Sequence, residues 1–193
     1  MESLVRTFLA NYVVPSPEMV TDVAQRLRRV AMPRETRLLT AGEVCRHLYL
    51  VEKGFARGFY HDAADRERTS WFWSEQDVLV SYESFLQQTP TEENIELLED
   101  AVLYRLGFDD LQELYDRHPA LNRVGRLLAE EAFFRAGNLA RILRLGNTRE
   151  NYLALVEAYP QLLQRAYLKD IAGYLGVSQE TISRVRAAVA NAR

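Results

Sequence analysis

The chain has 193 residues, 48% hydrophobic and 26% charged, which is typical of a globular protein with room for one large domain or two small ones. One cysteine and three histidines exclude an intrachain disulfide and a Cys-rich metal or iron–sulfur framework, and they indicate a reducing cytoplasm. The net charge of −3 alone argues against a nucleic-acid-binding protein, and no apolar run reaches the roughly 18 residues of a membrane span.

The charges are unevenly distributed along the chain. From Arg141 onward there are eight Lys and Arg against four Asp and Glu, although the whole chain has 24 basic and 27 acidic residues. A basic segment attached to an acidic body is typical of a separate DNA-contacting module. Chance asymmetry over a short segment is the alternative.

The first thirty residues are predicted to be helical. The segment MESLVRTFLANYVVP indicates a short amphipathic helix rather than a signal peptide. Ser16, Pro17 and Glu18 form a start signal for a second helix, with Ser as the cap, Pro at the first position and an acid in the first turn. Apolar residues at helical spacing predict that this helix continues to about Met32-Pro33.

Residues 35–107 have the pattern of short strands. Aromatic and β-branched runs are interrupted by Gly, Asp and Pro: TRLLT, HLYLVEKG, FARGFYHD, RTSWFW, NIELLED and AVLYRLG. We expect a bend at Lys53-Gly54, a hairpin loop at 61–65 and a short helix within VSYESFLQQTPTEEN. The spacing predicts a compact antiparallel sandwich or barrel.

A long helix is predicted from about Ala120 to Leu145, after the break at His118-Pro119. One stripe of this helix is apolar apart from Arg135: Leu121, Val124, Gly125, Leu128, Ala132, Ala136, Leu139, Ile142 and Leu143. A stripe this long between two modules favours packing against the same helix of a second chain. Packing against its own β-domain is the alternative. Gly146-Asn147 ends the helix, and Asn147 or Thr148 caps the next one.

The stretch DIAGYLGVSQETISRVR predicts a helix-turn-helix, because two helices that cross steeply at a short turn impose specific residue types. Gly176 supplies a turn residue that tolerates a positive φ, and Ala172 is the small residue at the crossing. The remaining contact positions are all apolar: Ile171, Leu175, Val177, Ile182 and Val185. An ordinary helical hairpin is the alternative.

The second of these helices has the residue types that read bases. Ser178 is placed to cap it, with Glu180 in its first turn. The polar side consists of Gln179, Glu180, Ser183 and Arg184, which suit adenine, cytosine and guanine edges. Lys169, Thr181 and Arg186 are candidates for phosphate contacts. Each of these alone is compatible with an ordinary solvated surface.

LKDIAGYLGVSQETISRVR resembles the DNA-binding element of the Crp/Fnr transcription regulators, whose recognition helix reads S-R-E-T-hydrophobic-x-R. Ser178, Glu180, Thr181 and Arg184 match, whereas Gln179 replaces the usual Arg, so a different target sequence is expected. YLVEKGFARGFY is similar to the hairpin of the family's sensor domain. SYESF and an end without the usual winged hairpin resemble one subgroup.

The resemblance implies an α+β fold with three parts. These are a cyclic-nucleotide-binding-like β-roll with flanking helices at 1–119, a dimerisation helix at 120–146, and a helix-turn-helix DNA-binding domain at 147–193. It further implies a cytoplasmic homodimer that is not an enzyme. Its recognition helix at 178–187 enters the major groove of palindromic DNA, and RNA polymerase is a further partner.

The phosphate cassette of the family is degenerate in this chain. Relatives that bind cyclic nucleotides carry G-E-L and, some ten residues later, R-[ST]-A, whereas this chain has Val80-Ser81 and Glu92-Glu93-Asn94. A carboxylate about 4 Å from a phosphate costs roughly 1 kcal/mol in water and several times that when partly buried. We therefore expect no cofactor and no cyclic AMP or cyclic GMP in the usual mode. Tyr82, Glu83 and Ser84 are candidates for touching another small molecule, and a pure packing role is the alternative.

Two other functions compete with DNA binding. The chain could be a ligand- or protein-binding module with little DNA affinity, which the net charge favours. A cupin-like enzyme needs two close histidines and a carboxylate, and His47 and His61 lack the H-x-H spacing. A haem sensor needs axial ligands, for which His47, His61 and His118 are candidates in residue type only. A lone histidine is more often structural.

Overall fold

The computed structural model describes residues 1–190 of the chain. The helices are α1 (Glu2–Ala10), α2 (Pro17–Arg26), α3 (Tyr82–Gln87), α4 (Phe108–Arg117), α5 (Pro119–Leu145), α6 (Thr148–Ala158), α7 (Leu162–Arg165), α8 (Leu168–Tyr174) and α9 (Gln179–Ala190). The strands are β1 (Arg28–Met32), β2 (Arg37–Leu39), β3 (His47–Lys53), β4 (Ala56–His61), β5 (Glu67–Trp73), β6 (Val78–Leu79), β7 (Asn94–Leu97) and β8 (Ala101–Gly107).

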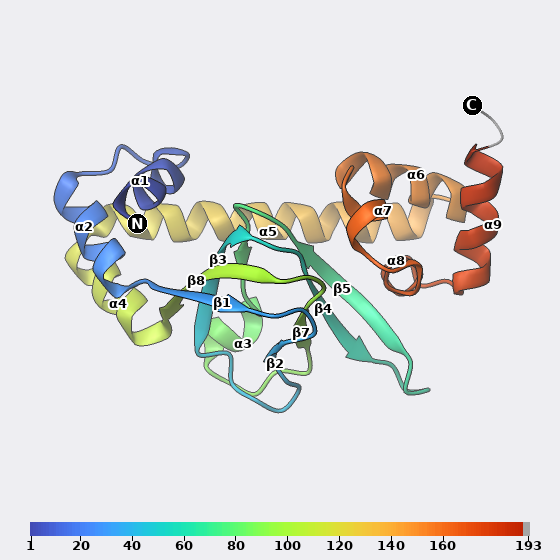
Figure 1. Ribbon diagram of the computed structural model, residues 1–193, viewed down its shortest axis with the longest axis horizontal. Helices are drawn as coiled ribbons and strands as arrows, with labels where there is room; N and C mark the ends of the chain where they lie inside the picture. Colours follow the sequence, from blue (N-terminus) through green and yellow to red (C-terminus); the bar gives the residue numbers. More distant parts are fainter. Residues whose placement is uncertain (191–193) are drawn as a thin grey trace.

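The long helix α5 runs the length of the molecule (Figure 1). Helices α1, α2 and α4 gather at one end of it, the β-roll lies along its middle, and α6 to α9 surround its other end. None of the helices within residues 1–190 is long and apolar enough to cross a bilayer.

The β-roll consists of two antiparallel four-stranded sheets. One has the order β1-β8-β3-β6 and the other β2-β7-β4-β5. The chain passes between them at Gly54, where φ is +125° and a Cβ would lie 2.5 Å from that of Ala101, so only glycine fits this corner. The antiparallel sandwich, the bend at Lys53-Gly54, the hairpin loop before β5 and the short helix α3 are all confirmed.

The prediction that the second helix continues to Met32-Pro33 is wrong. The Ser16 side chain accepts a hydrogen bond from the Met19 amide as expected, but the helix ends at Arg26. The next residues form β1, which pairs with β8 along its whole length. Val30 and Met32 fit the spacing of a helix as well as that of a strand. The segment forms a strand because it pairs with the edge of β8.

The apolar stripe predicted on α5 mostly faces the protein's own domains. Leu121 and Val124 are buried among α1, α2 and α4, and Leu139 packs against the C-terminal helices. Arg135 donates hydrogen bonds to the Tyr159 hydroxyl (2.7 Å) and the Phe72 carbonyl (3.2 Å) and stacks over Trp71. Most of the stripe therefore packs within the chain, whereas Ala136 and Leu143 are exposed, and dimerisation through this helix stays a prediction.

The opposite side of α5 exposes aromatic rings instead. Phe133 and Phe134 are 74% and 69% exposed, and their ring centroids lie 5.9 Å apart. Gly137 follows one turn later, and a Cβ there would meet nothing within 4 Å. The described part of the chain therefore leaves an apolar surface on α5 without an intrachain partner.

Candidate nucleic-acid interface and effector cavity

The helix-turn-helix predicted near the C-terminus is present as α8 and α9. Gly176 has φ of +68°, which confirms the expected turn residue. The Val177 amide donates to the Ala172 carbonyl (3.0 Å), so the chain reverses immediately after α8. Ile171, Ala172, Leu175 and Ile182 are buried, and Val177 and Val185 pack against them. These contacts hold α9 across α8.

The sequence around the turn also explains how α9 begins. The Thr181 amide donates to the Ser178 hydroxyl (3.3 Å), which is the capping contact expected at a helix start. Hydrogen bonds from its own backbone and from Ser178 lower the pKa of Glu180, so this carboxylate is ionised in the first turn. An acid there complements the positive end of the helix.

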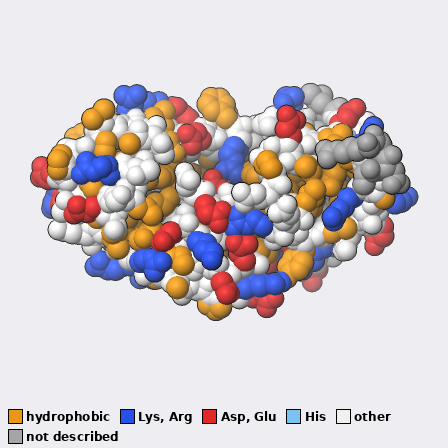
Figure 2. Space-filling view, turned by 45° about the horizontal axis from the view of Figure 1, so that its top comes forward, with side chains coloured by type: hydrophobic (Ala, Val, Ile, Leu, Met, Phe, Trp, Pro, Cys, Tyr) orange, Lys and Arg blue, Asp and Glu red, His pale blue; other side chains and the backbone are white. Residues whose placement is uncertain are grey.

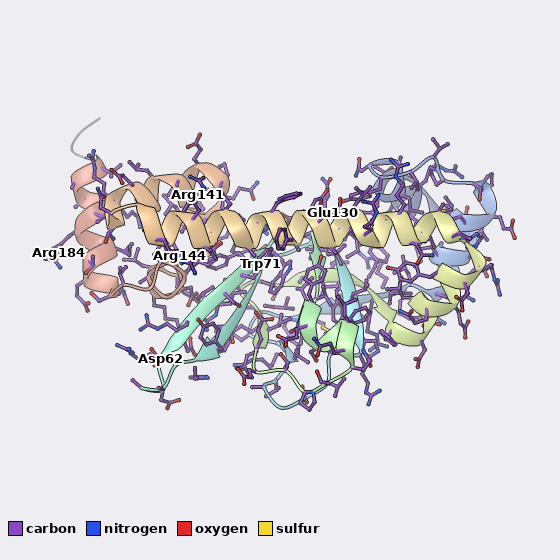
Figure 3. All side chains as sticks on the ribbon, turned by 180° about the vertical axis from the view of Figure 1, so that it is seen from behind. Asp62, Trp71, Glu130, Arg141, Arg144 and Arg184 are labelled. Atoms are coloured by element: carbon purple, nitrogen blue, oxygen red, sulfur yellow. The ribbon has the colours of Figure 1, made fainter. Side chains whose placement is uncertain are left out.

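One side of α9 is exposed to solvent within residues 1–190. Five of the predicted base- and phosphate-contacting residues lie on it and are exposed: Gln179, Glu180, Ser183, Arg184 and Arg186. Figure 3 shows Arg184 pointing away from the molecule at its C-terminal end. Ser178 is also exposed, whereas Thr181 is half-buried and its hydroxyl lies 3.1 Å from that of Ser178.

Lys169 differs from the other predicted contacts, because it lies on α8 and close to the β-roll. Its ammonium nitrogen is 3.9 Å from the Glu67 carboxylate and 5.9 Å from the centre of the Tyr167 ring. Figure 2 shows acidic and basic side chains interspersed over the lobe formed by the C-terminal helices. On α9 itself, Arg184 and Arg186 are the two exposed cationic side chains that can meet a phosphate backbone.

A cavity of about 530 Å³ occupies the position where the sequence predicts the degenerate phosphate cassette. It brings together α3 and the segment before β7, and its lining includes Tyr60, Ser81, Tyr82, Glu83, Ser84, Pro90, Thr91, Glu92 and Glu93. Three of these residues are acidic and none is basic, so the cavity disfavours an anionic ligand.

The three candidate ligand contacts differ in their surroundings. Ser84 is buried, and its hydroxyl accepts from the Cys45 amide (2.9 Å) and donates to the Thr89 carbonyl (2.5 Å), which supports a structural role. Burial raises the pKa of Tyr82 to about 12, and its hydroxyl lies 3.4 Å from the Leu128 carbonyl of α5. Glu83 alone is exposed.

Glu93 is the acidic group that lies deepest in this cavity. The Ser70 hydroxyl donates to its carboxylate, and a Cβ on Gly58 would lie 2.5 Å from the same oxygen, so the missing side chain makes the room. Burial raises the pKa of Glu93, while hydrogen bonds from Ser70 and Ser81 oppose the shift. The sequence aligned Glu93 with the phosphate position, but it gave no signal for Ser70 or Tyr60, which come from other strands.

Between Met1 and Ala190, no three His, Cys, Asp or Glu side chains are grouped to hold a metal ion. His118 is buried, and its Nε2 lies 2.8 Å from the Asp22 carboxylate, so it has the structural role expected of a lone histidine.

Comparison with known proteins agrees with this architecture. Residues 29–118 match the cyclic nucleotide-binding domain family. The c-di-GMP-responsive global regulator CLP of Xanthomonas campestris is 16% identical, with a TM-score of 0.72 over 91% of this chain and 92% of that one. FixK2 of Bradyrhizobium japonicum is 15% identical, with a TM-score of 0.74 over 86% and 85%.

A protein of Eubacterium rectale described as a transcriptional regulator of the Crp/Fnr family is 16% identical, with a TM-score of 0.73 over 92% of this chain and 83% of that one. No curated protein sequence matches the chain. The fold thus consists of a β-roll joined through a long helix to a helix-turn-helix. Residues 29–118 are similar to the cyclic nucleotide-binding domain, and the chain as a whole has the fold of these solved regulators.

Proposed function

We propose that this protein is a DNA-binding transcription regulator that inserts α9 into the major groove. The observation that carries the proposal is the exposed polar side of α9, held outward by the buried corner at Gly176. The solved relatives include transcription regulators with the same order of domains, which supports this function. The chain is divided as the sequence predicts: a sensor at 1–119, a dimerisation helix at 120–146, and a DNA-binding domain at 147–193.

The residues on α9 have distinct roles in this proposal. Arg184 forks onto a guanine, Gln179 pairs with an adenine, and Glu180 accepts from a cytosine amino group. Ser178, Thr181, Ser183, Lys169 and Arg186 contact phosphates or flanking bases. Lys169 reaches DNA by leaving its distant partner Glu67, which is inexpensive because the ammonium group is more than half exposed.

The protein acts as a homodimer through the outer side of α5. Phe133 and Phe134 are the apolar anchors, and Gly137 allows the two helices to approach closely. A two-fold dimer presents two recognition helices to major grooves about 34 Å apart, so the operator is palindromic. RNA polymerase is a further partner, and the cytoplasm is the compartment.

The sensor cavity does not take cyclic AMP or cyclic GMP in the usual mode. Glu93, Glu92 and Glu83 line it, and no Arg, Lys or His is among the lining residues of the described chain, so no cationic group is available to neutralise a cyclic phosphate. Isothermal titration calorimetry with cyclic AMP, cyclic GMP and c-di-GMP is expected to show no binding at micromolar concentrations. Micromolar affinity for either mononucleotide would contradict this part of the proposal.

The DNA-binding function is tested by selecting bound duplexes from a random palindromic library. The wild-type protein is expected to enrich one operator, with an affinity that falls steeply with salt concentration because counterions are released. Arg184→Ala should weaken binding to that operator by about 1–3 kcal/mol and relax selectivity at one base pair. Arg28→Ala, a charge-matched control on the exposed start of β1, should leave both properties unchanged.

Failure of the wild-type protein to enrich any sequence in low salt would overturn the proposal. A ligand- or protein-binding module with little DNA affinity would then be the better interpretation.

A further inference from the structure

The helix-turn-helix domain is packed directly against the β-roll and does not hang freely from α5. Helix α8 lies along β5. A Cβ on Gly173 would come within 3.2 Å of the Glu67 carbonyl and the Thr69 amide, so the backbones of the two elements nearly touch. The rings of Phe72 and Tyr174 lie 5.4 Å apart across the same junction. The two domains therefore share one buried surface.

A buried ion pair lies at the centre of this surface. Arg57 of β4 is 2% exposed and Asp170 of α8 is 1% exposed, and the guanidinium Nη1 donates to the Asp170 Oδ1 (2.7 Å). The other guanidinium nitrogens donate to Glu96 (2.8 Å) and Glu67 (2.6 Å). Arg57 thus connects three carboxylates, of which only Asp170 belongs to the helix-turn-helix.

A second cationic contact lies on α7. Arg165 donates to Glu75 (2.7 Å) and to Glu99 (3.1 Å), which both belong to the sensor side, and its guanidinium stacks 4.8 Å from the centre of the Phe55 ring. Two arginines, one from each domain, therefore cross the junction in opposite directions. Such forked contacts restrict rotation as well as distance.

The docked arrangement leaves the DNA-reading surface free. Gln179, Ser183 and Arg184 are exposed while Asp170 and Gly173 contact the β-roll, because α8 offers opposite sides to β5 and to α9. Figure 3 shows α9 at the extreme end of the molecule, beyond α5 and away from most of the β-roll. The contact is compatible with a recognition helix that is already presented to DNA.

We propose that the hydrogen-bonded contact between Arg57 and Asp170 is a positioning contact that holds the helix-turn-helix in its DNA-presenting orientation without an effector. This inference rests on the proposed DNA-binding function and adds how that function is controlled. The protein's own side chains do what a bound ligand would otherwise have to do, which is to select one orientation of the two domains. Arg57 and Asp170 act through α9 and do not touch DNA themselves.

Substitution of Arg57 should cost more than substitution of Asp170. Removing Arg57 leaves the Asp170 carboxylate buried without a counter-ion, and breaking a buried pair in this way is strongly destabilising. Its Oδ2 already lacks a hydrogen-bond partner in the described chain. Asp170→Asn instead leaves Arg57 with Glu67 and Glu96, and the amide oxygen of the variant can still accept the Arg57 hydrogen bond, so this is a milder change.

The test compares Arg57→Gln, Asp170→Asn, the double variant and the control Arg29→Gln. Arg29 makes an ion pair with Glu52 inside the sensor domain, so its substitution removes the same charge without touching the junction. Each full-length protein is titrated with the selected palindrome, with a single half-site, and with a palindrome lengthened by one base pair. The insertion rotates one half-site by about one-tenth of a turn.

Arg57→Gln is expected to lower palindrome affinity about ten-fold or more, because two half-sites are no longer pre-positioned, while half-site affinity stays unchanged. The penalty for the inserted base pair should shrink, since freed domains tolerate either spacing. Asp170→Asn should change each affinity less than three-fold, and the double variant should recover most of the loss. Arg29→Gln should match the wild type.

Rescue across the domain boundary separates positioning from simple stabilisation. If Arg57→Gln only damaged the β-roll through Glu67 and Glu96, Asp170→Asn would restore nothing, and the proposal would be wrong. Unchanged palindrome affinity and an unchanged spacing penalty in Arg57→Gln would also overturn it.

A spin–spin distance measurement keeps the inference separate from the proposed function. Labels at Gln87→Cys on α3 and Ala188→Cys on α9 report the domain orientation in labelled chains diluted with unlabelled chains. The wild type should give one narrow distance, Arg57→Gln a broad distribution, and the double variant a narrow one. If no duplex is bound but these distributions follow the prediction, the DNA-binding proposal fails and the positioning contact stands. Equal widths in all variants would refute the contact.

Discussion

The two ends of α5 are joined to the rest of the molecule by different kinds of contact. At its N-terminal end, Leu121 and Val124 enter an apolar cluster with residues of α1, α2 and α4. At its C-terminal end, the helices that follow contact the sensor through aromatic rings and through Arg57 and Arg165, each with several carboxylates. Apolar packing is non-directional, whereas forked ion pairs specify an orientation.

This difference assigns separate tasks to the two junctions. The apolar junction keeps α5 attached to the N-terminal helices mainly through contacts that do not depend on pH or salt. The ionic junction determines how the helix-turn-helix is turned relative to the sensor, and it responds to charge. The exposed rings of Phe133 and Phe134 lie between the two junctions, so a second chain can bind there without disturbing either.

The largest expected effect is at the apolar junction. Leu121→Ala removes a side chain that is 5% exposed and should lower the free energy of unfolding by about 2–5 kcal/mol, because the lost contacts leave a cavity. Thermal denaturation followed by circular dichroism measures this loss. A decrease below about 1 kcal/mol would show that the N-terminal helices can collapse onto α5 and fill the cavity. The apolar junction would then not depend on close packing around Leu121.

The exposed middle of α5 should matter for assembly and not for folding. Replacing both Phe133 and Phe134 by Ser is expected to weaken dimerisation by about 2 kcal/mol or more per ring, with little change in thermal stability at low protein concentration. Sedimentation equilibrium measures the dissociation constant. Glu131→Gln, on the same helix and also exposed, is the control. A double variant that remains dimeric would exclude this surface as the interface.

Acid should strengthen the docking of α8 at the ionic junction. Burial raises the pKa of Asp170 from its ordinary 3.8 to about 6, although Arg57 of β4 and Lys169 of α8 oppose the shift; Glu67 of β5 and Glu96 of β7 reinforce it. The docked form therefore binds a proton more tightly than the undocked form, and lowering the pH from 7 to 5 should favour docking by about 1 kcal/mol.

The contact between Arg165 and Glu75 should persist when the pH falls from 7 to 5. Hydrogen bonds from Arg165 lower the pKa of Glu75 to about 2, so the stability that it adds is complete above its ordinary value of 4.5 and is lost only as the pH falls toward 2. Amide hydrogen exchange of α8 at pH 7 and pH 5, corrected for intrinsic rates, measures docking. Asp170→Asn should abolish the pH dependence, and weaker protection of wild-type α8 at pH 5 would contradict the prediction.

The smallest effect is expected for an ion pair at the rim of the apolar junction. Arg117 lies 3.1 Å from Asp22, but its side chain is 55% exposed. Arg117→Gln should change the free energy of unfolding by less than about 1 kcal/mol, because solvent screens exposed pairs. Chemical denaturation measures it. A loss as large as that from Leu121→Ala would mean that charge also holds this end, and the two junctions would no longer differ.

Much of the fold was predictable because it depends on neighbours in the sequence. The corner at Gly176, the cap at Ser178 and the capping box of Asn147 with Glu150 each involve residues a few positions apart. The strands of the β-roll were visible from short runs of aromatic and β-branched residues. The segment that became β1 was misread as helix, since its pairing with β8 involves residues far away in the chain.

The candidate sites were less predictable, for the same reason. The exposed polar side of α9 follows from the helical period, and the structure confirms its exposure. The partner of Glu93 in the cavity is Ser70, which lies on a different strand and has no distinguishing pattern. The sequence also did not predict that Phe133 and Phe134 are the most exposed apolar residues of α5. An apolar stripe gives no information on which part of the protein packs against it.

The sequence by itself determined the local elements of this protein, the helix-turn-helix and the acidic replacement of the phosphate cassette, because helical period, turn chemistry and charge act over short stretches of chain. Only the tertiary structure decided which surfaces meet. Arg57 and Asp170 are 113 residues apart and have no shared motif, and they are paired because packing α8 on β5 buries both charges in one place, where the Asp170 carboxylate needs Arg57 as its counter-ion.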